Sequence, residues 1–225
     1  MSALEAREAY RLWAPTYSDE TAISFLEDRL VQSMTPSLSG KRLLDVGCGT
    51  GRRIRQSGAA LAVGLEPCRE MLAAGIATDG PLSGVELVVG DVRDIPLQSC
   101  EFAVIWCRLV LGHLPQIDIA YAELARVADL GATVIISDFH PAAADAGHRR
   151  SFRLGDDVIE IEHHVHRLDD HIEAASAAGL VVEQVRDAAI GNDVRPFYEN
   201  AGRTDSYAEH LGLPIVHAIA FRKAS

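Results

Sequence analysis

The sequence predicts an α/β fold in which a parallel sheet is covered by helices on both faces. From residue 41 onward, short apolar runs alternate with segments of helical pattern, which is the rhythm of consecutive βα units. The runs are apolar throughout, as strands buried on both faces require. Three of them also finish in an acid, Asp45, Glu66 and Asp91, at intervals of one βα unit. Such acids predict a nucleoside pocket along one edge of the sheet.

The elements follow from the pattern in chain order. Residues 2–35 have helical spacing, interrupted at Ala14-Pro15, and Pro36 and Gly40 then mark a short linker. The alternation that follows predicts strands at 42–46, 61–65, 85–89, 101–106 and 132–137, with helices at 50–58, 68–78 and 116–129.

Beyond His140 the rhythm breaks. Residues 158–166 predict a strand outside the repeating pattern, and a helix at 168–178 ends at Gly179, a C-cap signal. Strands at 180–187 and 215–222 bring the predicted sheet to seven strands. Residues 191–214 are too long for a plain connection and predict a helix or a surface flap.

Composition excludes several classes of protein. The 225 residues carry 32 acids and 21 bases, a formal net charge of −11, which argues against non-specific binding to nucleic acid. No apolar run approaches the ~18 residues of a membrane span, and no signal peptide is recognisable. The four cysteines lack metal-type spacing, as expected in a reducing compartment. We therefore expect a cytoplasmic protein.

The glycines at 47, 49 and 51 follow directly on an apolar strand. Such a turn brings backbone N–H groups against a ligand with no Cβ in the way. A dinucleotide fold needs G-x-G-x-x-G, but Arg52 stands where the third glycine would be. Asp45 would also place a negative charge beside a pyrophosphate. Spacing and charge therefore favour cationic S-adenosylmethionine over a nicotinamide dinucleotide.

Four blocks then carry a family resemblance: 43–51, 63–67, 90–97 and 109–115. In this order they resemble the class I S-adenosylmethionine-dependent methyltransferases, above all the branch that includes ubiquinone and menaquinone biosynthesis enzymes and many small-molecule methyltransferases. The resemblance covers residues 41–138. It implies a Rossmann-like three-layer sandwich with a seven-stranded, mostly parallel sheet, an antiparallel last strand and an N-terminal helical cap. It also implies S-adenosyl-L-methionine as cofactor and S-adenosyl-L-homocysteine as its product.

The resemblance implies roles for residues near the methionine and the ribose. Gly47, Cys48 and Gly49 would lie under the methionine portion, and Asp45 would lie near its amino group. Glu66 would accept both ribose hydroxyls, a geometry that suits a carboxylate.

The other implied contacts surround the adenine and close the site. Pro67 and Cys68 would flank the ring, Asp91 would accept its exocyclic amine, and the Val92 N–H would reach a ring nitrogen. The backbone carbonyl of Cys107 would meet the amino group of the methionine. Tyr17 resembles the cap tyrosine that closes over the cofactor.

The sequence also offers candidates for catalysis and substrate binding. His140 follows a strand at the edge where ligands of open α/β sheets bind, so it is the first candidate for a general base, with a solvated loop histidine as the alternative. Arg108, beside the cofactor, would contact an anionic substrate or turn away to a surface acid. Arg149, Arg150 and Arg153 would hold an acidic substrate or lie in solvent, balanced by nearby acids.

The histidines at 163, 164, 166 and 171 suggest a metal site only at first sight. The segment lacks the carboxylate pattern of zinc sites, and alternate residues of a strand face opposite sides. We therefore expect no metal.

The predicted function is transfer of a methyl group from S-adenosylmethionine to oxygen or carbon of a small molecule. The alternatives are an enzyme that cleaves or cyclises the cofactor and a non-catalytic module that binds it together with a protein partner. We expect one domain over 1–225, comprising a helical cap (1–39), a cofactor-binding half (40–138) and a substrate-side half (139–225). The sequence leaves open the acceptor and the oligomeric state, a homodimer included.

Overall fold

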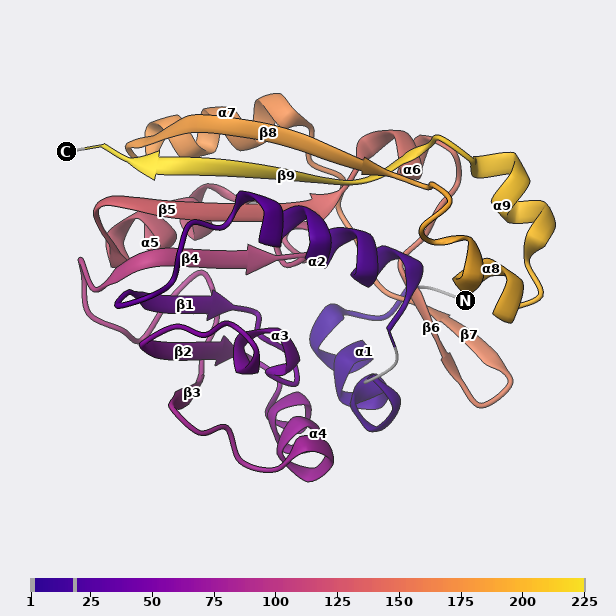
Figure 1. Ribbon diagram of the computed structural model, residues 1–225, viewed down its shortest axis with the longest axis horizontal. Coiled ribbons are helices and arrows are strands. Elements are labelled where there is room, and N and C mark those ends of the chain that lie inside the picture. The colour runs from indigo at the N-terminus through magenta and orange to yellow at the C-terminus, as the bar shows by residue number, and fades with distance from the viewer. Residues whose placement is uncertain (1–2, 18–19, 225) are drawn as a thin grey trace.

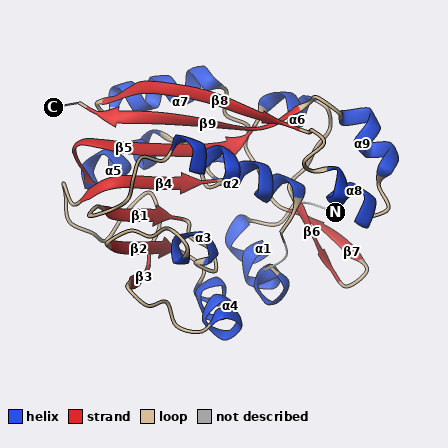
Figure 2. Cartoon of the chain, viewed as in Figure 1, coloured by secondary structure: helices blue, strands red, loops and turns tan. Residues whose placement is uncertain are grey.

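The computed structural model describes residues 3–17 and 20–224, so the ends of the chain and positions 18–19 of the predicted cap lie outside it. A seven-stranded sheet runs through the centre in the order β3-β2-β1-β4-β5-β9-β8 (Figures 1 and 2). Its strands are β1 (Arg42–Val46), β2 (Leu61–Glu66), β3 (Val85–Val89), β4 (Phe102–Arg108), β5 (Ala128–Phe139), β8 (Leu180–Ala189) and β9 (Pro214–Lys223). β9 runs antiparallel to β5 and β8, and β1 to β5 pair in parallel, which confirms the predicted fold class.

Helices surround this sheet, and a short hairpin projects from its carboxyl edge (Figure 1). The α-helices are α1 (Ala6–Trp13), α2 (Ala22–Met34), α3 (Arg52–Arg55), α4 (Arg69–Asp79), α5 (Asp118–Val127), α6 (Pro141–Asp145), α7 (Leu168–Ala177), α8 (Arg195–Asn200) and α9 (Thr204–His210). The 3₁₀ helices are η1 (Ala14–Thr16) and η2 (Leu111–His113), and the hairpin strands are β6 (Ser151–Leu154) and β7 (Asp157–Glu160).

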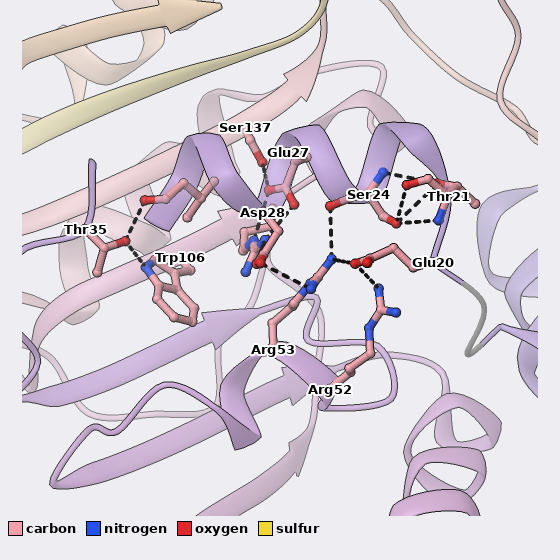
Figure 3. Close-up of polar contacts among 12 residues, drawn as sticks. Glu20, Thr21, Ser24, Glu27, Asp28, Thr35, Arg52, Arg53, Trp106 and Ser137 are labelled. Carbon is pink, nitrogen blue, oxygen red and sulfur yellow. Dashed lines mark hydrogen bonds and ion pairs between the residues drawn. The ribbon is translucent and has the colours of Figure 1, made fainter. Parts of the chain in front are cut away.

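The central strands are buried on both faces, as their apolar runs predict. Alternate side chains of a strand point to opposite faces, so Ile105 packs in the core beneath α5 and α7 while Trp106 packs in the core beneath α2. Trp106 is fully buried, and its indole N–H donates to Thr35 Oγ1 at 3.1 Å (Figure 3). This bond satisfies the polar end of an otherwise apolar side chain.

α2 belongs to the sandwich, although the sequence grouped it with the cap. Its residues Leu30, Val31 and Met34 pack on the sheet. A capping box begins the helix, in which Thr21 and Ser24 each accept the other's backbone N–H (Figure 3). The sandwich therefore includes the second N-terminal helix.

The cap over the carboxyl edge of the sheet is instead built from residues 3–17 and 150–164. The Leu4 N–H donates to the Glu160 carbonyl at 2.9 Å, and the Glu162 N–H donates to the Leu4 carbonyl at 2.7 Å. Apolar side chains of α1, β6 and β7 share one small core around Ala9, Phe152 and Ile161. We call these two segments the cap. Because they lie far apart in the sequence, composition alone does not join them.

Two predicted elements differ from the structure. The strand expected at 158–166 ends at Glu160, because β7 pairs only with the four residues of β6 and the following chain bonds to Leu4 instead. The helix expected at 50–58 is the single turn α3. Residues 191–214 contain helices, α8 and α9, as one of the two predictions for that region states. Among the described helices, none is long and apolar enough to cross a membrane.

A buried ion cluster fastens α2 to the ends of β4 and β5. Glu27 accepts from Arg108 Nε at 2.9 Å and Nη2 at 2.6 Å, and also from the Ser137 hydroxyl at 2.6 Å. Arg108 Nη2 also donates to Asp28 at 2.8 Å. Figure 3 shows Glu27 reaching Ser137, and Asp28 reaching Arg53 of α3. Burial works against the charged guanidinium, but Glu27, Asp45 and Asp28 outweigh it and raise the pKa of Arg108.

Replacing Arg108 with methionine should lower the free energy of unfolding by about 3–5 kcal/mol, because Glu27 would then be a buried charge without its partner. Urea denaturation measures this loss. Arg29→Met is the matched control: its ion pair with Asp193 is exposed, so it should cost at most ~1 kcal/mol. Equal losses in the two variants would contradict a structural role for the cluster.

Candidate cofactor and active site

A cavity of about 710 Å³ opens at the carboxyl ends of β1, β2 and β4, beneath the cap. Its volume lies within the range of ~300–1,000 Å³ that is usual for ligand sites. It brings together the predicted cofactor residues other than Cys107: Tyr17, Asp45, Gly47, Cys48, Gly49, Glu66, Pro67, Cys68, Asp91 and Val92. The three strand-end acids therefore predicted the correct edge of the sheet, because the cavity opens there.

The glycine turn after β1 is packed too tightly for another residue. A Cβ on Gly47 would lie 2.2 Å from Val110 Cγ2, and Gly47 also has a φ of +71°. The Gly47 and Cys48 N–H groups both donate to the Leu65 carbonyl, at 2.7 and 3.0 Å. The turn is thereby fixed against β2, and Gly47 leaves the backbone bare at the wall of the cavity.

Glu66 ties the first turn to the second. One carboxylate oxygen accepts the Gly49 N–H at 2.9 Å, and the other accepts the Cys68 N–H at 2.9 Å. Burial raises the pKa of Glu66, and the two backbone hydrogen bonds oppose that rise. Each oxygen keeps a further lone pair for a ligand hydroxyl. The carboxylate is thus held in place by the fold and can still accept from the cavity.

Asp45 supplies a buried carboxyl group beside this turn. Only 2% of the residue is exposed. Burial raises the pKa of Asp45 to about 7, with Glu27 adding to the rise and Arg108 opposing it. A carboxyl group that titrates near neutrality with acidic neighbours favours a cationic ligand over an anionic one. The amino group and the sulfonium of S-adenosylmethionine meet that condition.

Asp91 and Val92 line the far side of the cavity. The Asp91 carboxylate accepts from Arg93 Nε at 2.9 Å and Nη2 at 2.6 Å, and Arg93 holds its pKa below the usual range. Val92 is buried in the core beneath α5. An adenine amine would therefore share Asp91 with Arg93.

Tyr17 lies over the glycine turn. Its ring is 3.7 Å from the position of a Cβ built on Gly49 and meets Trp13 edge-on at 4.8 Å between centroids. Burial raises the pKa of Tyr17, so its phenol stays neutral at physiological pH. Trp13 stacks on Phe152 inside the cap.

The two residues predicted at the end of β4 differ in their placement. Cys107 is fully buried and is not among the residues that line the cavity, whereas Arg108 and Leu109 are, so the contact of the Cys107 backbone carbonyl stays a prediction. Arg108 forms ion pairs with Glu27 and Asp28. Pairing with an acid was one of the two predicted alternatives for Arg108, but these acids belong to α2 and are not on the open surface. The sequence pattern could not show this pairing, because the partners lie about 80 positions apart.

Leu109 is a strained residue at the cavity wall. Its φ of +56° is rare for a residue with a branched side chain. The Leu109 N–H donates to the Ser137 carbonyl at 2.9 Å, and the Leu109 carbonyl accepts from Arg150 Nη1 at 2.9 Å. Arg150 is buried, while Arg149 and Arg153 are exposed and outside the cavity lining, so these three arginines form no common substrate site.

His140 is placed differently from the prediction. It caps the N-terminus of α6, where its Nδ1 accepts the Ala142 N–H at 3.1 Å, and it does not line the cavity. The strand before it does end at the carboxyl edge, but the side chain is used by the helix that follows.

His113 lines the cavity instead. Its Nε2 is 2.5 Å from Arg150 Nη1 and 3.2 Å from the Tyr10 hydroxyl, and its Nδ1 is 3.3 Å from the Glu162 carbonyl. Burial and the adjacent Arg150 lower the pKa of His113 to about 3, so its ring is neutral and its acceptor nitrogen is occupied. It joins the cap to the loop after β4.

The remaining histidines do not assemble a metal centre. In the described part of the chain, no three His, Cys, Asp or Glu side chains are grouped so as to hold a metal ion. His163 lies 3.5 Å from Asp138, and His171 Nδ1 pairs with the Tyr121 hydroxyl at 2.9 Å. His164, with Glu162, is on the cavity wall, a placement that the sequence analysis did not anticipate.

Comparisons with known proteins agree with this site. Residues 44–136 match the family model described as a methyltransferase domain. The 27-O-demethylrifamycin SV methyltransferase of Amycolatopsis mediterranei is 26% identical over 214 residues, which cover 90% of this chain and 75% of that protein. The ubiquinone biosynthesis O-methyltransferase of Methylococcus capsulatus is 31% identical over 138 residues, which cover 57% of this chain and 56% of that protein.

Solved structures show the same fold. An S-adenosylmethionine-dependent methyltransferase from Mesorhizobium loti superposes with a TM-score of 0.66 at 20% identity, covering 88% of this chain and 97% of that one. A Haemonchus contortus phosphoethanolamine N-methyltransferase, determined with S-adenosylhomocysteine, gives a TM-score of 0.68 at 15% identity. The match covers 98% of this chain and 58% of that one. Together with the match to the methyltransferase domain and the cavity, these structures support an S-adenosylmethionine-dependent methyltransferase.

Affinity for S-adenosylhomocysteine should fall as the pH drops below 7. The Asp45 carboxyl must be ionised to pair with the ligand's ammonium, and below its pKa of about 7 it must first lose a proton. The limiting slope is ~tenfold per pH unit. Calorimetric titration between pH 5.5 and 8.5 measures the effect. Asp45→Asn should remove the slope, whereas Asp79→Asn, on the exposed end of α4, should keep it.

Glu66→Ala should weaken binding of S-adenosylhomocysteine by about 1–3 kcal/mol, because a charged hydrogen-bond acceptor is lost. Calorimetry at fixed pH gives the change in affinity. Thermal unfolding of the free protein separates this effect from the loss of the Gly49 and Cys68 hydrogen bonds. Unchanged affinity would argue against Glu66 as a cofactor contact.

Proposed function

We propose that this methyltransferase acts on a hydroxyl group of a small organic molecule. The observation that carries the proposal is the extent of the cavity. Beyond the cofactor residues it continues along a second wall made by Tyr10 of the cap, Leu109 and His113 of the loop after β4, and Glu162 and His164 of the second cap segment. This second wall supports a place for an acceptor beside the cofactor residues.

The residues present fit the cofactor that the family requires. Asp45 is a buried carboxyl with acidic neighbours, and Gly47 leaves bare backbone at the cavity wall, where a Cβ would collide with Val110. We assign Asp45, Gly47 and Gly49 to the methionine, Glu66 to the ribose, and Asp91 to the adenine, with Tyr17 above them. When bound, S-adenosylmethionine supplies an electrophilic methyl group on a sulfonium.

The protein's own contribution is alignment and exclusion of water. Tyr17 and the cap cover the turn after β1, and the bonds to Leu109 hold the wall that faces the acceptor. Orientation of this kind lowers the barrier by up to ~7–11 kcal/mol. The continuous second wall supports methyl transfer over cleavage or cyclisation of the cofactor, which would need no acceptor space.

The relatives support oxygen as the acceptor atom. The Methylococcus capsulatus relative is named as an O-methyltransferase, as are a Penicillium expansum protein and a rice protein named as a probable tocopherol methyltransferase. The match spans 56% of the Methylococcus capsulatus protein, 51% of the Penicillium expansum protein and 34% of the rice protein. We therefore extend to it the reaction type and no individual substrate.

The cellular compartment and the class of substrate belong to the same proposal. The four cysteines are all unpaired, which supports a reducing compartment such as the cytoplasm. The net charge of −11 supports a small-molecule substrate over a nucleic acid.

Methyl-labelled S-adenosylmethionine incubated with the protein and a panel of catechol, 1,4-naphthohydroquinone and cyclohexanol should give a product one methyl group heavier than its acceptor. Mass spectrometry detects it, and heat-denatured protein is the control. Consumption of the cofactor without a methylated product would support cleavage or cyclisation instead. Tight binding of S-adenosylhomocysteine with no consumption would support the non-catalytic module.

A further inference from the structure

The segment after β7 places two ionisable side chains on the acceptor wall. Its backbone is fastened on both sides: the Glu162 N–H donates to the Leu4 carbonyl at 2.7 Å, and the His164 N–H donates to the Gly112 carbonyl at 2.7 Å. In this extended segment, His163 points inward to Asp138, with a side chain 13% exposed. Glu162 and His164, one position to either side, line the cavity.

Glu162 and His164 also contact each other. The distance from His164 Nε2 to Glu162 Oε1 is 3.5 Å. A carboxylate beside one ring nitrogen orients the imidazole and leaves the other nitrogen to accept a proton, which is the arrangement of a base with its orienting group. The His164 side chain is 33% exposed, so a captured proton has a path to solvent.

The other histidines are unsuited to this task. His113 shares the wall, but Arg150 and Tyr10 occupy its Nε2. His140 caps α6, and His171 is fully buried against Tyr121. Among the histidines that line the cavity, His164 is the one beside a carboxylate side chain.

We propose that His164 is the general base of the reaction and that Glu162 positions it. His164 takes the proton of the acceptor hydroxyl as the acceptor oxygen forms its bond to the methyl carbon. The carbon–sulfur bond breaks, its electron pair stays on sulfur as the neutral thioether, and the imidazolium then releases its proton to water. The inference rests on the proposed function, since it requires a hydroxyl acceptor.

The test compares His164→Ala, Glu162→Gln and the control His148→Gln, whose ring packs against His210 away from the cavity. With whichever panel acceptor the unaltered protein turns over best, His164→Ala should lower kcat ~10²–10⁴-fold, the usual contribution of a general base. KM for S-adenosylmethionine should not change, and added imidazole should restore part of the rate. Glu162→Gln should lose less, and His148→Gln should match the unaltered protein.

A His164→Ala variant with unaltered kcat, or one that imidazole does not rescue, overturns the inference and leaves the proposed function standing. Loss of S-adenosylhomocysteine binding by the unaltered protein would instead overturn the proposed function. If the cofactor binds but no panel acceptor is methylated, NMR of the histidine rings decides. Catechol added to the S-adenosylhomocysteine complex should shift the ring signals that His164→Ala removes, and unmoved signals overturn the inference.

Discussion

The bonds between Glu27, Arg108 and Ser137 hold the molecule's functional edge together. They connect α2 to the ends of β4 and β5, inside a core where removal of Arg108 would leave Glu27 as a buried charge without its partner. Asp28 extends the cluster to Arg53 at the helix that follows the glycine turn. The wall of the cavity therefore rests on an ion cluster, and the strained Leu109 comes directly after Arg108.

The same cluster shapes the charge of the site. Arg108 is paired with two acids of α2, and its charge only partly offsets the effect of burial on the pKa of Asp45. The result is a carboxyl group poised near neutrality beside bare backbone. A ligand with an ammonium and a sulfonium suits this environment, whereas a pyrophosphate does not. Cofactor preference is thus a property of α2 as well as of the glycine turn.

The acceptor side depends on contacts between distant parts of the chain. Leu4 bonds to residues 160 and 162, and His113 contacts both Tyr10 of α1 and Arg150. Through these bonds the cap and the loop after β4 form one wall. A change in either cap segment would alter the acceptor space without touching the cofactor residues, which gives this fold a way to vary its substrate while keeping its chemistry.

The sequence by itself determined the sheet, the glycine turn and the three strand-end acids. These features depend on local propensity and on residues within one βα unit, where pattern and structure agree because both strand faces are buried. It could not determine which histidine or arginine faces a ligand. The His140 side chain caps the helix that follows it, and Arg108 pairs with Glu27. The backbone N–H groups of Glu162 and His164 donate to the carbonyls of Leu4 and Gly112. Those choices are made by partners distant in the chain, which only the folded structure brings within hydrogen-bonding distance.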